Sequence, residues 1–244
     1  MSADKNFMDE AVAEYWHKAG TARGRFKITI RLWMKRQLWR IVIGSSMFLK
    51  RTLDVVAALL VLAAASPVLL LTMLCIKLED GGPLFFQQTR VGLRGRTFGM
   101  WKFRSMVMNA DAIKDKLLSQ NEMKGGVTFK MKDDPRVTKT GKWIRKFSID
   151  EMPQIINVLH GEMSLVGPRP PVPREVAEYT VEDRQRLMVK PGLTCFWQVG
   201  GRSNIDFAGQ VRLDVAYIRS ESIWLDFKLL LKTVPAVLFG KGAY

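Results

Sequence analysis

The sequence has very few cysteines and histidines, which limits the disulfide bonds and the cysteine or histidine metal sites that it could form. Only two cysteines occur in 244 residues, Cys75 and Cys195, so neither a disulfide framework nor a cysteine-based metal site is expected. A low cysteine content without a disulfide framework fits a reducing compartment. His17 and His160 are far apart in the sequence, and we expect structural or surface roles for both. The first twenty residues lack the apolar stretch of a secretory signal, so export is not expected.

Acidic residues are scarce relative to basic ones. The chain has 38 Lys and Arg against 23 Asp and Glu, which leaves a net charge of +15. Such a balance indicates an anionic partner, either nucleic acid, an acidic membrane surface or a phosphorylated substrate, and charge alone does not choose among them. The 48% apolar content excludes wholesale disorder, and the sequence contains no internal repeat or low-complexity segment.

One segment carries no charge over the length of a membrane. Residues 55–76 are 22 uncharged residues, which as a continuous helix would extend for about 33 Å. Length alone is compatible with a single spanning helix or with a buried core helix. Ser66 and Pro67 fall in the middle of the run, where the proline removes a backbone hydrogen bond, so a kink or a break is expected.

The flanks of this segment are basic on both sides. Residues 21–51 contain nine Lys and Arg and no acid, and residues 77–104 contain six Lys and Arg against two acids. Basic flanks mark the cytoplasmic side of a membrane segment, so both ends are expected in the cytoplasm. The pattern therefore predicts a re-entrant membrane helix over residues 48–78, broken at Ser66 and Pro67, which enters and leaves by the same face.

Two further segments have the composition of helices that lie at a lipid surface. Residues 31–51 interleave large apolar residues such as Trp33 and Trp39 with basic residues, and belong mostly to an N-terminal extension over residues 1–47. A basic helix that binds nucleic acid is the competing interpretation of this segment. Residues 223–239 mix aromatic residues and leucines with lysines, which suits either a second interfacial amphipathic helix or a core helix.

The remainder, residues 79–244, is expected to form one body of mixed α and β structure that is predominantly helical. Aromatic runs around a Gly and Arg turn predict a small β-hairpin over residues 83–106. Helices are expected over 109–124, from near Glu151 to Gly161, and over 174–190 and 205–221, with a turn-rich loop over 125–142 and a proline-stiffened stretch after Gly161.

An Asp–Glu pair, Asp150 and Glu151, stands just before a proline at the start of one predicted helix. If Ser148 were the N-cap and Glu151 closed a capping box, Pro153 would fall inside the helix and break it, so Asp150 is the better N-cap. The two carboxylates would then lie at the positive end of the helix dipole, where phosphate groups are favoured as well. An acidic N-cap with a purely structural role is the alternative.

The sequence around this pair is rich in cations. Arg145 precedes it, and Arg169 and Arg202 follow in the turn-forming motifs GPRP and GGRSN. An ionised carboxylate can attack phosphorus as a nucleophile when cations neutralise the phosphoryl group. A carboxylate among cations in a chain with a membrane segment therefore predicts phosphoryl transfer to or from a lipid.

Several motifs occur in one order along residues 48–244. They are KRTLDVVAALLVLAAASPVLLL, GGPLFFQQTRVG, KFRSM, DDPRVTKTGKWIRKFSIDEMPQIINVLHGEMSLVGPRP, KPGLTCFWQVGGRSN and LDVAYI. Together they resemble the bacterial sugar transferases, the monotopic polyprenyl-phosphate phosphoglycosyl transferases. The resemblance implies a monotopic enzyme of the bacterial inner (cytoplasmic) membrane, with a re-entrant helical hairpin and a catalytic domain, residues 79–244, that faces the cytoplasm.

The resemblance also implies a reaction. Such an enzyme transfers hexose-1-phosphate from a UDP-sugar to undecaprenyl phosphate, releases UMP, and passes through a covalent aspartyl-phosphosugar intermediate. Mg²⁺ is the implied cofactor. The C-terminal KTVPAVLFGKGAY is similar to members that initiate exopolysaccharides from UDP-galactose or UDP-glucose, and a UDP-N-acetylated amino sugar is the alternative substrate. An anionic phospholipid membrane is an implied partner, nucleic acid is not, and a homo-oligomer is left open.

Position in these motifs gives each candidate residue an implied role. Asp150 is the nucleophile, and Glu151 is the general base for the lipid phosphate or, together with Asp150, a metal ligand. A further set is implied to bind phosphate, uridine or sugar, with some members serving instead in structural ion pairs: Lys102, Arg104, Arg136, Arg145, Arg169, Arg202 and Gln198. Gln154, Asn157 and Gln198 are each expected either to bind sugar or base or to pack a helix. A membrane-tethered nucleic-acid-binding protein and a scaffold without catalytic activity are the hypotheses from other classes.

Overall fold

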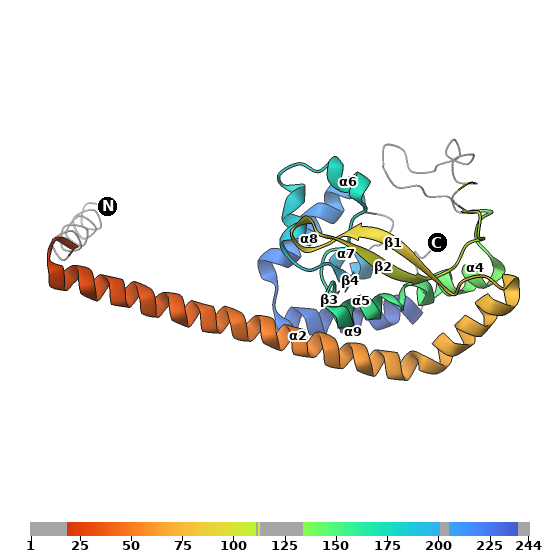
Figure 1. Cartoon of the computed structure of the whole chain (residues 1–244), viewed down its shortest axis with the longest axis horizontal. Helices are drawn as coiled ribbons and strands as arrows, with labels where there is room; N and C mark the ends of the chain where they lie inside the picture. Colours follow the sequence, from red (N-terminus) through yellow and green to blue (C-terminus); the bar gives the residue numbers. More distant parts are fainter. Residues whose placement is uncertain (1–18, 111, 113–133, 201–204, 239–244) are drawn as a thin grey trace. The chain divides into compact units, whose positions relative to one another are not determined.

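The computed structural model describes residues 19–110, 112, 134–200 and 205–238 (Figure 1). The chain divides into two compact units, residues 1–52 and residues 53–244, which are described separately. Helix α2 (Ala22–Asp80) contributes residues to both units. Among the described residues it is the one helix that is long and apolar enough to cross a membrane.

In the smaller unit, the described part of the chain is mainly helix α2. The Thr21 hydroxyl accepts a hydrogen bond from the Gly24 amide and so caps the start of the helix. Large apolar side chains are exposed along it, including Trp33 and Trp39. The helix predicted over residues 31–51 is therefore confirmed, while its contact with lipid stays a prediction.

In the larger unit, α2 stays helical through Ser66 and Pro67. The Ser66 hydroxyl donates a hydrogen bond to the Ala63 carbonyl at 2.8 Å. Figure 1 shows the orange part of the helix bending, as expected for a helix with an interior proline. Of the two outcomes expected at Ser66 and Pro67, the structure therefore shows the kink and not the break, because the remaining backbone hydrogen bonds carry the helix past the proline. The reversal of direction that a re-entrant hairpin requires stays a prediction.

The predicted β-hairpin is confirmed. Strands β1 (Phe85–Val91) and β2 (Thr97–Phe103) pair in antiparallel orientation on either side of the short turn η1 (Leu93–Gly95). Side chains alternate between the two faces of a strand pair, so the observed register puts Arg90 and Lys102 on the same face of the hairpin.

The Asp–Glu pair lies between two short helices. α4 (Lys139–Lys146) begins inside the segment predicted as a loop, residues 125–142, and is followed by the 3-10 turn η3 (Ile149–Glu151). α5 (Gln154–His160) confirms the helix expected in this region. The helix predicted over residues 109–124 lies almost wholly outside the described residues.

Local sequence explains where these helices begin and end. The Thr138 hydroxyl accepts a hydrogen bond from the Gly141 amide at 2.9 Å, which caps the start of α4. Pro153 stands at the N-cap of α5, where its missing N–H removes no helical hydrogen bond. Gly161 ends α5 with a φ of 82°, a conformation that glycine adopts without steric cost.

A second strand pair has no counterpart in the predictions. β3 (Ser164–Val166) and β4 (Gly192–Thr194) pair in parallel orientation. A β-carbon on Gly192 would lie 2.0 Å from the Gly167 amide nitrogen, so the close approach of the two segments requires glycine there. Each strand has only 3 residues, too few to show an alternating pattern.

Helices make up most of the remaining described chain. In place of the single helix predicted over residues 174–190, the structure has two short elements, α6 (Pro173–Ala177) and the 3-10 helix η4 (Asp183–Met188). After them come α7 (Phe196–Gly200), α8 (Phe207–Ser220) and α9 (Ile223–Leu238). The last two confirm the helices expected over 205–221 and 223–239.

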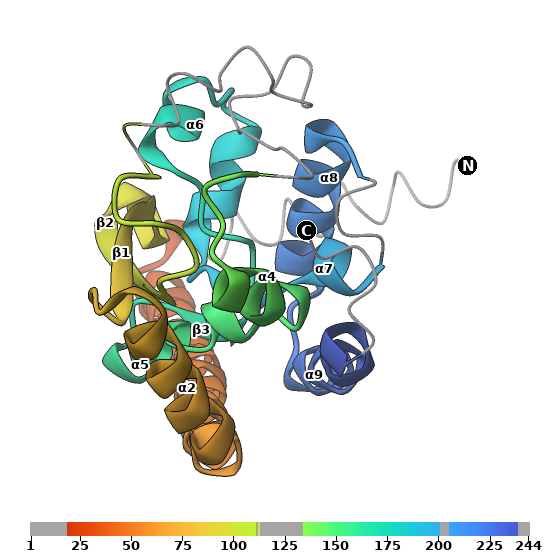
Figure 2. The same ribbon diagram turned by 90° about the vertical axis from the view of Figure 1, so that its right-hand side faces the viewer.

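The main hydrophobic core joins α2 to the rest of the larger unit. Its buried members come from α2, the hairpin, α5, β3 and the residue before it, α8 and α9: Ala58, Met100, Ile155, Val158, Met163, Leu165, Val166, Tyr217 and Leu229. In Figure 2 the hairpin and α5 lie on one side of this unit, and α8 and α9 on the other. On α9, Leu229 is buried while Trp224 is 64% exposed, so this helix has both a core face and a surface face. The expected predominantly helical class of mixed α and β structure is confirmed.

Candidate active site

Asp150 and Glu151 belong to η3, between α4 and α5. Ser148, just before them, has a φ of 56° and a ψ of 23°, a left-handed conformation that is unfavourable for a residue with a side chain. The predicted N-cap role of Asp150 is wrong, because Pro153 occupies that place in α5. An Asp150 N-cap would bind the amide of residue 153, which is a proline and has no amide hydrogen. The two acids lie instead in η3, a separate turn ahead of α5.

Glu151 is held by two cations from distant parts of the chain. The Lys102 ammonium on β2 donates a hydrogen bond to Glu151 Oε1 at 3.0 Å, and Arg169 Nη1 lies 3.8 Å from the same oxygen. Burial by itself would raise the pKa of Glu151, but the charges of Lys102 and Arg169 outweigh it and lower that pKa to about 2. Glu151 is therefore a carboxylate at any physiological pH.

Asp150 has the opposite electrostatic character. Burial and the negative charge of Glu151 raise the pKa of Asp150 to about 6, against the opposing charges of Lys102 and Arg145. Two neighbouring carboxyl groups whose environments push their pKa values apart are typical of sites that assign them different chemical roles. At neutral pH Asp150 is ionised, yet its oxygens are more basic than those of Glu151.

Arg169 is oriented by an aromatic ring and by its own loop. Its guanidinium carbon lies 5.9 Å from the centroid of the Trp197 ring. The loop around it is fixed to the end of β1, because Val91 donates a backbone hydrogen bond to the Pro171 carbonyl at 2.9 Å. Arg169 is therefore held beside Glu151 by contacts from three separate segments.

Arg90 supports the same loop and is a residue that sequence reasoning left out of the site. It donates a hydrogen bond to the Pro170 carbonyl at 3.0 Å and two to Gln88 Oε1, at 2.7 and 3.2 Å. Burial and the charge of Arg169 lower the pKa of Arg90 to about 10, so it is still a cation at neutral pH. Its place on the same hairpin face as Lys102 is the signal that could have identified it.

A small hollow opens beside these groups. Its empty volume is about 210 Å³ including its open mouth, and it is lined by Met100, Glu151, Gln154, Arg169, Pro170, Gly192, Leu193 and Gln198. The space in it that a water-sized sphere can enter is only about 10 Å³, room for roughly one water molecule, so the hollow does not by itself form a pocket for a nucleotide sugar. The structure thus brings Gln154 and Gln198 together with Glu151 and Arg169.

The remaining predicted cations are placed differently. Arg104 pairs with Asp80 at the end of α2, and Arg136 pairs with Asp134 at 2.6 Å. Both arginines are buried with a carboxylate partner, which is the structural role expected for some members of the set. Arg145 is partly buried, and its charge acts on Asp150. Arg202 lies outside the described residues.

Asn157 is fully buried and serves to pack its helix. Its Oδ1 accepts a hydrogen bond from the Trp101 amide at 3.0 Å, and its Nδ2 donates to the Gly99 carbonyl at 2.8 Å and to Glu162 at 2.7 Å. These bonds fix α5 to β2, the strand that carries Lys102. Of the two roles expected for Asn157, the geometry favours the packing role.

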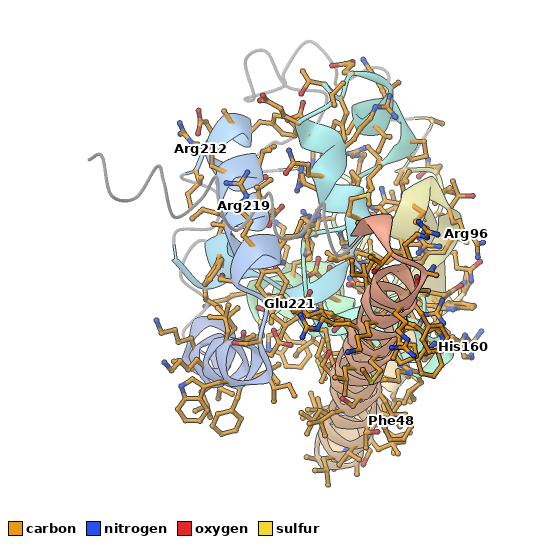
Figure 3. All side chains as sticks on the ribbon, turned by 90° about the vertical axis from the view of Figure 1, so that its left-hand side faces the viewer. Phe48, Arg96, His160, Arg212, Arg219 and Glu221 are labelled. Carbon is orange, nitrogen blue, oxygen red and sulfur yellow. The ribbon has the colours of Figure 1, made fainter. Side chains whose placement is uncertain are left out.

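The basic residues are not confined to the neighbourhood of the acid pair. Figure 3 shows Arg96 at the hairpin and Arg212 and Arg219 on α8, on different sides of the larger unit. All three are exposed. The net positive charge therefore does not by itself mark the site.

The donor set for a metal is small. The described residues contain no group of three His, Cys, Asp or Glu side chains that could hold a metal ion. Mg²⁺ commonly takes only one or two protein carboxylates and completes its coordination with substrate phosphates and water. Asp150 and Glu151, adjacent in one turn, match that pattern, with phosphate oxygens as the missing ligands.

Several known proteins are similar in sequence to most of this chain. Galactosyl transferase CpsE of Streptococcus agalactiae is 50% identical over 200 residues, which are 82% of this chain and 44% of that protein. Undecaprenyl-phosphate galactose phosphotransferase of Salmonella typhimurium is 43% identical over 203 residues, 82% of this chain and 42% of that protein. Exopolysaccharide production protein ExoY of Sinorhizobium fredii is 41% identical over 198 residues, 80% of this chain and 88% of that protein.

The chain spans less than half the length of the first two of these relatives and most of the third. A family model described as bacterial sugar transferase matches residues 45–240. That range contains the kinked part of α2, the hairpin, and the turn with Asp150 and Glu151. The chain therefore belongs to the bacterial sugar transferase family.

Proposed function

We propose that this chain transfers hexose-1-phosphate from a UDP-sugar to undecaprenyl phosphate and releases UMP through a covalent intermediate on Asp150. One observation carries the proposal: Asp150 has a raised pKa beside Glu151, which is bound by Lys102 and Arg169. The names of the relatives support the reaction class, since two are undecaprenyl-phosphate galactose and glucose phosphotransferases.

In the first step, an Asp150 oxygen attacks the β-phosphorus of the UDP-sugar, the phosphorus that carries the hexose. The bond from Asp150 oxygen to phosphorus forms, the bond from that phosphorus to the bridging oxygen breaks, and UMP leaves with the electron pair. The ionised form of Asp150 predominates above about pH 6, so the nucleophile needs no base at neutral pH. Lys102 and Arg169, which both contact Glu151, would neutralise charge on the diphosphate.

In the second step, an oxygen of undecaprenyl phosphate attacks the phosphorus of the aspartyl-phosphosugar. The new diphosphate bond forms, the Asp150 ester bond breaks, and the carboxylate is restored. A phosphate monoester has a second pKa of about 6, so the acceptor is largely ionised at pH 7 and needs no general base. With its pKa held at about 2, Glu151 is a poor base, and we assign it instead to electrostatic and metal-binding roles.

Mg²⁺ is the proposed cofactor, with Asp150 and Glu151 as its protein ligands. When bound, it supplies positive charge that neutralises the diphosphate. The carboxylate of Glu151 would keep Lys102 and Arg169 next to that diphosphate, because both contact its Oε1.

The larger unit's part of α2 supports a monotopic membrane arrangement. Six of its leucines are more than half exposed, namely Leu59, Leu60, Leu70, Leu71, Leu74 and Leu78. Leu69 and Ile76 on the same helix are buried in a second core cluster. We propose that the exposed face contacts lipid in a re-entrant path bent at Pro67, at the bacterial inner membrane, with the catalytic residues on the cytoplasmic side.

The transferred sugar is proposed to be galactose or glucose, in exopolysaccharide or other glycan synthesis. The names of relatives support this choice, since they mention galactose, glucose and exopolysaccharide production. A UDP-N-acetylated amino sugar is the alternative donor. Release of UMP from a panel of UDP-sugars would decide between them, with the highest kcat/KM expected for one of the two hexoses.

The reaction is tested without the lipid acceptor. Purified full-length protein in lipid nanodiscs is mixed with UDP-hexose that is radiolabelled in the sugar, and retained label and released UMP are measured. The proposal predicts stoichiometric retention and one UMP per label for the wild type, and neither for Asp150→Asn. Glu178→Gln, a change at an exposed acid, serves as the matched control and should behave as wild type. A wild-type protein that neither retains label nor releases UMP with any UDP-sugar contradicts the proposal, and leaves the binding-protein and scaffold hypotheses.

A further inference from the structure

Glu79, in the last turn of α2, binds the beginning of α4. Its Oε1 accepts a hydrogen bond from the Lys139 amide at 2.7 Å, and its Oε2 accepts one from the Thr140 amide at 3.1 Å. The first amides of a helix have no partner within the helix, and a carboxylate there also interacts favourably with the helix dipole. With Thr138 binding the Gly141 amide, each of the first three amides of α4 has a side-chain acceptor.

The same end of α4 is also fixed to the segment that follows β2. The Thr138 amide donates a hydrogen bond to the Ser105 carbonyl at 3.1 Å. A β-carbon on Gly141 would lie 2.0 Å from that carbonyl oxygen, so the helix rests directly on the backbone at Ser105. The beginning of α4 is therefore clamped between the end of α2 and the exit of the strand that bears Lys102.

The other end of α4 leads straight to the nucleophile. The Ser148 amide donates to the Arg145 carbonyl at 3.1 Å, and the Glu151 amide donates to the Ser148 carbonyl at 3.2 Å. Hydrogen bonds thus continue from the last turn of α4 through the left-handed Ser148 into η3. A tilt of α4 about its clamped end would be carried into the turn that contains Asp150.

The residue next to Glu79 makes a parallel connection. Asp80 accepts from Arg104, which stands two residues after Lys102 at the end of β2. The two successive acids at the end of α2 thus bind separate elements, one leading to Asp150 and one carrying Lys102. The last turn of α2 therefore contacts both the helix that leads to Asp150 and the end of the strand that carries Lys102.

We propose that Glu79 is a positioning residue for the chemical step: it fixes α4, and through α4 the turn that holds Asp150. This inference rests on the proposed function of Asp150 as the nucleophile. It also assigns the kinked helix a second task besides membrane attachment, because the end of that helix sets the geometry of the site. The Glu79 side chain is exposed, so its removal leaves no buried cavity and the variants are expected to fold.

The test uses Glu79→Ala and Glu79→Gln in the full-length protein in nanodiscs, with Glu178→Gln as the control for loss of an exposed acid elsewhere. Hydrogen–deuterium exchange is measured for peptides that cover residues 139–151. Single-turnover label retention from UDP-hexose gives, for each variant, the rate constant of adduct formation, the fraction of molecules that react, and the UDP-hexose concentration dependence.

The positioning role predicts faster exchange over residues 139–151 in Glu79→Ala, with Glu178→Gln unchanged. It also predicts a rate constant lowered roughly 10- to 100-fold, the range expected from a displacement of about 1 Å, with the reacting fraction and the half-saturating UDP-hexose concentration within about twofold of wild type. Glu79→Gln keeps one acceptor oxygen, so its exchange rate and its rate constant of adduct formation should lie between those of wild type and Glu79→Ala. A mainly structural role would instead lower the reacting fraction and leave the rate constant unchanged, and that outcome overturns the inference.

Failure of this inference can be told apart from failure of the proposed function. If wild type and Glu178→Gln form the adduct and Glu79→Ala forms it at the same rate, the positioning role is refuted and the proposed function stands. If the wild type forms no adduct, the proposed function fails. In that case the exchange rates over residues 139–151 still test whether Glu79 fixes α4. Equal rates in Glu79→Ala and wild type would show that it does not.

Discussion

Replacing Lys102 with methionine tests the electrostatic arrangement of the acid pair. The change removes the cation that is hydrogen-bonded to Glu151 at 3.0 Å and keeps much of the side-chain volume. A hydrogen bond to a charged group contributes about 1.5–3 kcal/mol, and one pKa unit corresponds to about 1.4 kcal/mol. The pKa of Glu151, now about 2, should therefore rise by roughly 1–2 units, which leaves Glu151 ionised at neutral pH.

The pKa of Asp150 should rise as well, because Lys102 opposes the effect of burial there too. A rise of about one unit, from about 6 to about 7, would lower the ionised fraction of Asp150 at pH 7 from roughly 0.9 to roughly 0.5. Protonation therefore accounts for only about a twofold loss of rate at pH 7, which is regained at higher pH. Any larger loss, independent of pH, measures the contribution of Lys102 to neutralising the diphosphate.

The assay is the single-turnover rate constant of adduct formation, measured from about pH 5 to about pH 9. The wild type should lose activity as the pH falls through about 6, since Asp150 becomes protonated there. Lys102→Met should show the same limb shifted to higher pH. Lys142→Met, at an exposed lysine on α4, is the control and should leave the profile in place. An acidic limb that does not move, or moves to lower pH, would refute the electrostatic reasoning.

Three further predictions concern stability, substrate binding and topology. Asn157→Ala removes the three hydrogen bonds that Asn157 makes to the Trp101 amide, the Gly99 carbonyl and Glu162, so the free energy of unfolding should fall by about 2–4 kcal/mol in chemical denaturation, and a loss below about 0.5 kcal/mol would contradict the packing role. Trp197→Leu removes the ring beneath Arg169 and should raise KM for the UDP-sugar several-fold, corresponding to about 1 kcal/mol, with kcat little changed; an unchanged KM would exclude this contact from substrate binding. Cysteines placed near residues 48 and 80 should both be labelled only from the cytoplasmic side, and Pro67→Ala should move some molecules to a spanning path, whereas periplasmic labelling at either wild-type end would refute the re-entrant path.

Local patterns were sufficient to predict the hairpin and the longer helices. The hairpin is signalled by aromatic strand residues on both sides of a glycine-containing turn, and the helix over Phe207–Ser220 starts at Asp206, whose side chain caps the Gly209 amide. Such signals act within a few residues, so they survive without knowledge of the tertiary fold.

Features that depend on contacts between distant segments were not predicted. The pairing of β3 with β4 joins two 3-residue strands, whose hydrogen bonds leave no periodic trace in the sequence. The start of α4 depends in part on Glu79, which is 60 residues earlier in the chain than Lys139, so the local turn-rich composition indicated a loop. Both features are therefore fixed by contacts between distant segments and not by signals in the local sequence.

The site was predicted unevenly for the same reason. Asp150 was identified from its place before a proline and among cations, and the structure brings Lys102 and Arg169 to its neighbour Glu151. Motif position could not separate these two cations from Arg104 and Arg136, which have carboxylate partners of their own. Which carboxylate a cation meets is decided by the fold and not by the spacing of the motifs.

The central claim is that Asp150 becomes esterified to a phosphosugar, and peptide mapping tests it most directly. Wild-type protein is mixed with UDP-hexose in the absence of undecaprenyl phosphate, denatured at once, digested and examined by mass spectrometry. The account predicts the added mass of one phosphohexose on the peptide that contains Asp150, and its disappearance when undecaprenyl phosphate is supplied. Release of UMP with no adduct, or an adduct on any other residue, would contradict it.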